Sequence, residues 1–360
     1  MRSGERCSMK NNLEAVLQQL LAVAKSQGDA IIGYRPLTHI KRPSSEVIKV
    51  ELRRHDSEPT YVVVKLFIPR RASFDVIKVL REKVRHDFGV TRRFFEAFKD
   101  YKDYSTAEPI MCLPEMLAVV MKESRGRNLR DLIAKDARFY PSKATIHKLL
   151  EQSYRCGEWL RIFQGLTEES IGDRLSLPDL IEDIDRRLRR LEEGEWLGRG
   201  WRSRILRYLE KQATFVEESD LRLCGVHADF SPSNVLINGN EVIVLDFTMY
   251  RIGSGYHDLT YFHRYFENFL HKPIFRPGTI AALQDSFLQG YRKTVSPASP
   301  IFKLFKMRHV ICHLVGIVKP SGSSLHERLF SRRVAQRYRK WLAEVTCETA
   351  RNELLLMGDR

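Results

Sequence analysis

The chain has 360 residues, of which 43% are hydrophobic and 29% charged, a balance typical of a globular protein with a sizeable core. Sixty Lys and Arg residues against 45 Asp and Glu residues give a formal net charge of +15, which favours an anionic partner such as a nucleotide, a nucleic acid, a membrane surface or a phosphorylated substrate. No apolar stretch approaches the ~20 residues that cross a bilayer, so the sequence excludes a membrane-spanning helix.

The N-terminal residues and the cysteines indicate a cytosolic protein. No apolar segment with a small-residue cleavage site follows Met1, so we expect no secretory signal. The six cysteines lie far apart without zinc-binding or redox spacing, and we interpret most of them as buried thiols. We therefore predict a cytoplasmic location.

The first third of the chain has the pattern of a small β-rich lobe. Helical periodicity over residues 13–27 ends at Gly28, and strand-like patterns follow from residue 34. We predict strand, strand, strand, helix, strand, strand over residues 34–123, which form a small antiparallel sheet with one packed helical region. The predicted strands include 46–53, 61–67, 109–113 and 117–121, and the helical segments are 74–88 and 90–100.

From residue 124 onward the pattern is mainly helical, with one strand pair at 234–237 and 241–246 joined by Asn238-Gly239-Asn240, a strong hairpin signal. The predicted helices are 128–136, 142–165, 177–193, 201–218, 256–270, 278–293, 300–317 and 325–356. We therefore predict an α+β fold with two lobes. Residues 1–123 form the β-rich lobe with its N-terminal helix, and residues 124–360 form the helical lobe that contains the hairpin.

Polar residues gather around the predicted hairpin. Asp229 and Asn234 lie five residues apart on the loop that enters it, and Asp246 follows its second strand. With the turn centred on residues 238–239, Asn234 lies opposite Ile243, and Asp246 projects beside Asn234. Two carboxylates and an amide oxygen are ligands suited to Mg²⁺ held jointly with substrate phosphates.

The pattern His227-x-Asp229-x-x-x-x-Asn234, with Asp246 at a strand end, resembles the catalytic core of the aminoglycoside phosphotransferase and choline kinase group, relatives of the protein kinases. The resemblance implies that Asp229 is the catalytic residue, which orients the attacking hydroxyl or accepts its proton. It also implies that Asn234 and Asp246 hold the Mg²⁺ ions that bridge the phosphates of ATP. His227 is implied to be structural rather than catalytic.

The segment after the core strengthens the resemblance. Gly253-Ser-Gly-Tyr-His-Asp258-Leu is similar to a family segment in which the Asp buttresses the catalytic loop, so Asp258 is implied to act on that loop rather than on substrate. The resemblance covers about residues 34–270 and implies a bilobal protein-kinase-like fold.

Upstream, the resemblance implies a strand lysine that holds the α and β phosphates and a helix glutamate that fixes it. Lys65 is the candidate lysine, and Glu96 is the candidate glutamate with Glu82 as its rival. Backbone groups near Met121 and Glu123, at the end of the last strand, are implied to receive the adenine.

One feature departs from the resemblance, because the loop over residues 41–45 between the first two strands has no glycine. Glycines let a backbone approach phosphates closely. We expect the hydroxyls of Ser44 and Ser45, or else the side chains of Lys41 and Arg42, to contact the phosphates instead. No P-loop or dinucleotide-binding glycine pattern is present, which excludes those two nucleotide folds.

The sequence thus predicts an enzyme, an ATP-dependent kinase that phosphorylates a hydroxyl of a small molecule or saccharide. A protein kinase is disfavoured because Asp246-Phe-Thr lacks the glycine of D-F-G and no A-P-E follows. Two alternatives stay open: a nucleotide-binding kinase-like scaffold without activity, and a nucleic-acid binder supported by basicity alone.

Basic residues concentrate at 186–190, 199–207 and 328–340. Such runs form either a solvated helix face or a footprint for an anionic surface. The net charge of +15 argues against a polycationic aminoglycoside and favours a neutral or anionic acceptor, such as a sugar, a glycan or a lipid-linked saccharide. A peripheral contact with an anionic membrane surface, at its inner face, is the accompanying interpretation of the basic helix.

Overall fold

The structure is a computed structural model that describes residues 3–26, 31–55, 58–69, 73–168, 173–292, 294–317 and 325–358. The chain divides into two compact units. Met1–Arg130 and Ser233–Tyr250 form the first unit, and Asp131–Pro232 and Arg251–Arg360 form the second. The predicted boundary at residue 123 differs from this division, because the hairpin after residue 233 pairs with strands of the first unit.

A five-stranded antiparallel sheet forms the centre of the first unit, as the sequence predicts. Its strands are rich in Val and Ile, which pack well on a pleated surface. The spatial order is β1 (Ile31–Lys41), β2 (Ser45–Arg54), β3 (Thr60–Phe67), β6 (Ala118–Lys122) and β5 (Pro109–Leu113), with the short helix η1 (Pro114–Met116) between β5 and β6.

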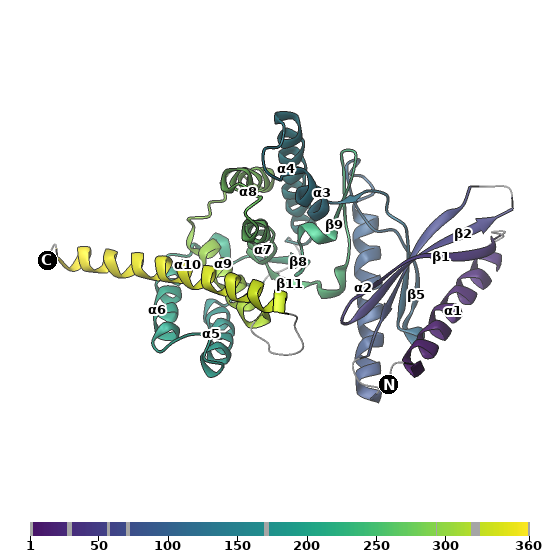
Figure 1. Ribbon diagram of the computed structural model, residues 1–360, viewed down its shortest axis with the longest axis horizontal. Helices are drawn as coiled ribbons and strands as arrows, with labels where there is room; N and C mark the ends of the chain where they lie inside the picture. The colour runs from purple at the N-terminus through teal and green to yellow at the C-terminus, as the bar shows by residue number, and fades with distance from the viewer. Residues whose placement is uncertain are drawn as a thin grey trace. The chain divides into compact units, whose positions relative to one another are not determined.

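Two helices cover the two faces of this sheet, α1 (Ser3–Ser26) and α2 (Phe74–Ala97) (Figure 1). Val16 and Leu17 of α1 belong to the apolar cluster on one face, and Val84 of α2 belongs to the cluster on the other. The sequence predicts a break near Gly89, but α2 is continuous. A glycine inside a helix costs only about 1 kcal/mol, which the packing of α2 outweighs.

The hairpin of the first unit belongs to a second, four-stranded sheet, in the order β4 (Tyr104–Thr106), β10 (Glu241–Val244), β9 (Val235–Asn238) and β7 (Arg127–Asn128). The predicted register is wrong by two residues, since Leu236 rather than Asn234 lies opposite Ile243. Gly239, with a φ of 60°, is the first central residue of the turn, the position where a two-residue hairpin favours glycine. Asn234 therefore lies opposite Leu245, whose N–H donates to its carbonyl oxygen at 2.9 Å.

The second unit is mainly helical, with a core in which α5, α6, α9 and α10 pack together. One strand pair, β8 (Leu223–Val226) with β11 (Arg251–Ser254), lies outside the predicted elements. The helices are α3 (Leu129–Asp136, which begins in the first unit), α4 (Lys143–Glu168), α5 (Leu177–Glu193), α6 (Trp201–Ala213), α7 (Tyr256–Glu267), α8 (Pro277–Tyr291), α9 (Pro300–Ile317) and α10 (Leu325–Gly358). Short 3-10 helices are η2 (Glu218–Leu221), η3 (Pro232–Asn234), η4 (Phe247–Met249) and η5 (Asn268–His271).

The predicted α+β class is confirmed by this arrangement of a small antiparallel sheet and a largely helical remainder. The predicted helix 201–218 ends early, at Ala213, and the other helices of the second unit agree with prediction to within a few residues. Within the described ranges, every helix is too short or too polar to cross a membrane.

Candidate active site

Lys65, on β3, is held by two carboxylates in the first unit. Its Nζ donates to Asp87 Oδ2 at 2.8 Å, to Asp246 Oδ1 at 2.7 Å and to Thr248 Oγ1 at 2.5 Å, and its side chain is 7% exposed. Burial by itself lowers the pKa of Lys65, but the charges of Asp246 and Asp87 outweigh this effect and raise that pKa above its usual value. Lys65 is therefore a fixed positive charge.

The helix carboxylate that holds Lys65 is Asp87, so the predicted partnership with Glu96 is wrong. Asp87 is buried on α2, whereas Glu96 is 54% exposed and pairs with Lys99, and the rival Glu82 is also exposed. Positions 87 and 96 are separated by about two and a half helical turns, which places them on opposite sides of α2. The sequence does contain a signal for Asp87, since it shares the buried stripe of α2 with apolar residues.

Asp246 lies just after β10, with a positive φ of 70° that is uncommon for a residue with a side chain. Its Oδ1 accepts hydrogen bonds from Lys65 and from the hydroxyl of Thr248, and its Oδ2 lies 3.5 Å from the guanidinium of Arg42. Neither Thr248 nor Asp87 is among the residues that the sequence singles out. Three contacts therefore fix the orientation of this carboxylate.

Asn234 and Asp246 supply two oxygen donors to one cavity of the first unit. The described part of the chain contains no group of three or more His, Cys, Asp and Glu side chains suited to a metal ion. Mg²⁺ in phosphoryl-transfer sites binds through one or two protein ligands together with phosphates and water, so this donor pair fits that ion in kind.

The cavity has a volume of about 280 Å³ and brings together several residues that the sequence predicts. Lys65, Met121, Glu123, Asn234 and Asp246 all line it. Its apolar lining comes from the five-stranded sheet with Val47 and Val63, from the loop after β4 with Ala107, and from the hairpin and the residue after it with Leu236 and Leu245. The cavity thus has two parts. One is apolar and suits a flat base, and the other is charged and contains Lys65 and Asp246.

The β1–β2 turn contributes Arg42 to this cavity, whereas Ser44 and Ser45 are not among its lining residues. The structure therefore places neither serine at the cavity, and a contact of either serine with phosphates stays a prediction. Ser45 is buried because it begins β2 and pairs with Phe67, and Ser44 is exposed in the turn. Lys41 pairs with Glu46 at 3.5 Å, so Arg42 is the cation that the turn presents.

In the second unit, Asp258 is fully buried and holds the loop that carries Asp229. Its carboxylate accepts hydrogen bonds from the backbone N–H groups of His227 at 2.6 Å and Ala228 at 2.9 Å. Ala228 has a φ of 64°, a conformation that costs about 1–3 kcal/mol and needs such support. His227 is fully buried, and its Nδ1 accepts a hydrogen bond from the N–H of Asp229 at 3.3 Å.

Tyr261 is a further residue at Asp229 that the sequence does not single out. Burial raises the pKa of the Tyr261 phenol, and the Asp229 carboxylate raises that pKa further, by its charge and by a hydrogen bond with the phenol. Tyr261 follows Asp258 by three positions on α7, which places both on one face of the helix. That spacing is visible in the sequence once the start of the helix is known.

Residues 128–294 match the model of a phosphotransferase enzyme family. The fold is similar to that of an aminoglycoside phosphotransferase with ADP bound (TM-score 0.54, 16% identity, covering 90% of this chain and 97% of that one). It is also similar to an amicoumacin kinase in complex with AMP-PNP and Ca²⁺ (TM-score 0.52, 15%, 89% and 93%) and to a choline/ethanolamine kinase family protein from Mesorhizobium loti (TM-score 0.50, 14%, 86% and 88%). No curated protein matches the chain by sequence.

These matches confirm the resemblance to the aminoglycoside phosphotransferase and choline kinase group, and they confirm the protein-kinase-like fold. The matched segment contains Asp229, Asn234, Asp246 and Asp258. The family match indicates a phosphotransferase of the kinase type.

Proposed function

We propose that this protein transfers the γ-phosphoryl group of ATP to a hydroxyl of a small molecule or saccharide. The observation that carries the proposal is the cluster of Lys65, Asp87 and Asp246 at the charged end of the 280 Å³ cavity. Phosphoryl transfer needs mainly alignment and neutralisation of charge, which a fixed cation and oriented carboxylates supply.

The nucleotide would bind in the cavity of the first unit. The apolar side chains of Val47, Val63, Leu236 and Leu245 suit the adenine ring, and the backbone near Met121 and Glu123 suits its polar edge. Lys65 would contact the phosphates, and Arg42 would take the part that a glycine-rich loop plays elsewhere, because a guanidinium matches phosphate oxygens with paired N–H groups. Two of the similar structures contain a bound nucleotide, ADP in the aminoglycoside phosphotransferase and AMP-PNP in the amicoumacin kinase.

Asn234 and Asp246 would hold Mg²⁺ between the protein and the phosphates. The ion would supply neutralisation of the charge that develops on the phosphate oxygens. The bonds from Lys65, Thr248 and Arg42 fix the Asp246 carboxylate before the nucleotide arrives. Asp87 keeps Lys65 charged and in place, so it is a positioning residue.

Asp229 would orient the acceptor and take its proton. The acceptor oxygen forms a bond to the γ-phosphorus, the bond from that phosphorus to the β–γ bridging oxygen breaks, and the electron pair leaves with ADP. The hydroxyl proton passes to the Asp229 carboxylate. Tyr261, through its hydrogen bond, and Asp258, through the loop backbone, hold Asp229 in position.

A neutral or anionic acceptor is favoured over an aminoglycoside. An enzyme for a polycation is expected to carry an excess of acidic groups, whereas this chain carries a net charge of +15. Sugars, glycans and lipid-linked saccharides therefore come first among candidate acceptors. Arg332 and Arg333 lie exposed on α10, and their helix remains a candidate for peripheral contact with an anionic membrane surface.

The test is transfer of labelled γ-phosphate to a panel of sugars, glycolipid fragments, amino alcohols and aminoglycosides. We expect Asp229→Asn to lower kcat at least a thousandfold and to change the Kd for ADP less than threefold, since Asp229 is not among the residues that line the nucleotide cavity. Asp285→Asn, at an exposed carboxylate on α8, is the matched control and should keep full activity. Undiminished turnover in Asp229→Asn would contradict the role assigned to Asp229. Aminoglycosides as the best acceptors would contradict the proposed class of substrate.

A further inference from the structure

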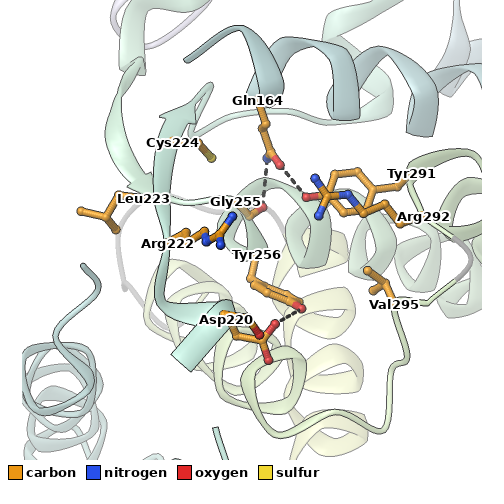
Figure 2. Close-up of a pocket in the computed structure, with 11 residues that line it drawn as sticks. Gln164, Asp220, Arg222, Leu223, Cys224, Gly255, Tyr256, Tyr291, Arg292 and Val295 are labelled. Carbon is orange, nitrogen blue, oxygen red and sulfur yellow. Dashed lines mark hydrogen bonds between the residues drawn. The ribbon is translucent and has the colours of Figure 1, made fainter. Parts of the chain in front are cut away.

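A second, smaller cavity lies wholly within the second unit, and nothing in the proposed transfer uses it. Figure 2 shows the residues that line it, and its volume is about 80 Å³. The residues that line it come from α4, η2, β8, α7 and the end of α8, so five elements converge on it. That volume is roughly the space of a few water molecules, which excludes a nucleotide or a sugar ring.

Hydrogen bonds fix the walls of this cavity. Gln164 donates to the carbonyl oxygen of Gly255 at 3.1 Å and accepts from the hydroxyl of Tyr291 at 2.7 Å, while the hydroxyl of Tyr256 donates to Asp220 Oδ1 at 2.7 Å (Figure 2). Gly255 packs closely against Gln164, because a Cβ at this position would lie 2.6 Å from Gln164 Oε1 and the amide would have to move. The shape of the cavity is therefore set before any ligand binds.

The cavity has an excess of positive charge. Arg222 and Arg292 line it from two different elements and lie on either side of Gly255 and Tyr256 (Figure 2). Among the described residues that line it, Asp220 is the single carboxylate, and it accepts the hydrogen bond from Tyr256. A guanidinium carries five N–H donors, so each arginine can keep a contact within the protein and still donate to a ligand.

We infer that this cavity binds a small phosphate oxyanion, either inorganic phosphate or the phosphate group of a small ester. Two guanidinium groups at a preformed site match the paired oxygens and the double charge of a phosphate. The cavity volume admits the phosphate group and leaves any ester substituent in solvent. A singly charged carboxylate would gain less from two cations.

The ligand would contact the two elements that carry the catalytic loop. β8 includes Leu223 and Cys224, which line the cavity, and it runs directly into His227. Tyr256 begins α7, which carries Asp258 two residues later. None of the cavity residues is among those proposed for transfer, so failure of either proposal leaves the other standing.

The test is calorimetric titration of the full chain, without nucleotide, using inorganic phosphate at constant ionic strength. We expect saturable binding of one phosphate that weakens at least tenfold in Arg222→Gln and in Arg292→Gln. Arg204→Gln, which removes an exposed arginine of α6, is the matched control and should leave the Kd unchanged. Lys65→Met should also leave it unchanged, because that lysine lies in the other cavity.

Titrations with glycerol phosphate and with acetate complete the experiment. Tighter binding of glycerol phosphate than of inorganic phosphate would identify an ester as the ligand, and weaker binding would identify the free ion. The inference is overturned by acetate that binds as tightly as phosphate, by the absence of binding, or by a loss of affinity in Lys65→Met that exceeds the loss in the arginine variants. Thermal unfolding of each variant checks that the chain is folded.

Discussion

The two units hold their key carboxylates by different chemistry. In the first unit, Asp246 is bound by the ammonium of Lys65 and lies near the guanidinium of Arg42, so opposite charge positions it. In the second unit, Asp229 and Asp258 accept from neutral donors, a phenol and backbone N–H groups. The cations beside Asp246 can also bind an incoming phosphate, whereas the neutral donors of the second unit only orient the carboxylates that they contact. The site of the first unit is thus suited to binding a charged ligand, and that of the second unit to keeping the Asp229 carboxylate in a fixed orientation.

After the thousandfold loss expected for Asp229→Asn, the largest effect is expected from removing the carboxylate that supports Lys65. In Asp87→Asn, we expect kcat/KM for ATP to fall about a hundredfold and the free energy of unfolding to fall by ~3 kcal/mol, because one partner of a buried ion pair is lost. Steady-state kinetics and urea unfolding measure the two quantities.

Glu96→Gln is the matched control for this change, since it removes a carboxylate from the same helix on its exposed side. It should leave kcat/KM for ATP within twofold, and the free energy of unfolding within ~0.5 kcal/mol, of the unaltered protein. A loss of activity in Glu96→Gln equal to that in Asp87→Asn would restore the glutamate as the partner of Lys65.

A comparison of the motif carboxylates with Asp87 shows which parts of the structure the sequence predicts. Local pattern predicts the helices well, including α5 at residues 177–193, since a period of 3.6 repeats over several turns. It misses β4, β7, β8 and β11, because strands of two to four residues have no periodicity and exist through their pairing. The motif indicates Asp229, Asn234 and Asp246. Whether Asp87 faces Lys65 depends on how α2 is rotated about its axis against the sheet, and the motif carries no information about that rotation.

The basic residues and the two serines of the β1–β2 turn show the same dependence on tertiary structure. The absence of glycine indicates that side chains replace the backbone at this turn, and both the serines and the basic residues are candidates. The choice depends on register, since Ser45 becomes the first residue of β2 and Arg42 remains in the turn. A single residue of shift in a strand reverses which side chains face a cavity.

The next effect concerns pH and the buried histidines that the second unit holds in their neutral form. Burial, together with a positive neighbour (Lys306 for His263 and Arg264 for His313), lowers the pKa of His263 to about 3 and that of His313 to about 4. The unfolded chain binds protons at these histidines below about pH 6.5. The stability that their neutral form provides is therefore present above pH 6.5 and is lost as the pH falls toward 4.

We expect the free energy of unfolding to fall by about 1.4 kcal/mol per pH unit for each such histidine in this window. Urea unfolding at pH 7.5, 6.0 and 5.0 measures the slope. His263→Gln should reduce it, and His147→Gln, at an exposed position on α4, should leave it unchanged. A slope that is the same in all three proteins would show that His263 titrates as it does in solvent.

A smaller effect is expected at Arg42. In Arg42→Ala, we expect the Kd for ADP to rise about tenfold and that for adenosine to stay the same, because the guanidinium interacts with phosphates rather than with the base. Lys41→Ala, which removes the neighbouring cation paired with Glu46, is the control and should change neither affinity. Equal losses for ADP and adenosine in Arg42→Ala would indicate a general disturbance of the cavity instead of a phosphate contact.

The smallest effect tests the neutral support of Asp229. Tyr261→Phe removes one hydroxyl and keeps the ring, so the Asp229 carboxylate loses a donor but no charge. A neutral hydrogen bond contributes about 0.5–1.5 kcal/mol, which corresponds to about a two- to thirteenfold fall in kcat. KM for ATP should not change, because Tyr261 does not line the nucleotide cavity. Tyr265→Phe, one turn further along α7, should leave kcat unchanged. If Tyr261→Phe altered KM for ATP and spared kcat, orientation of Asp229 by neutral donors would not be what limits the transfer step.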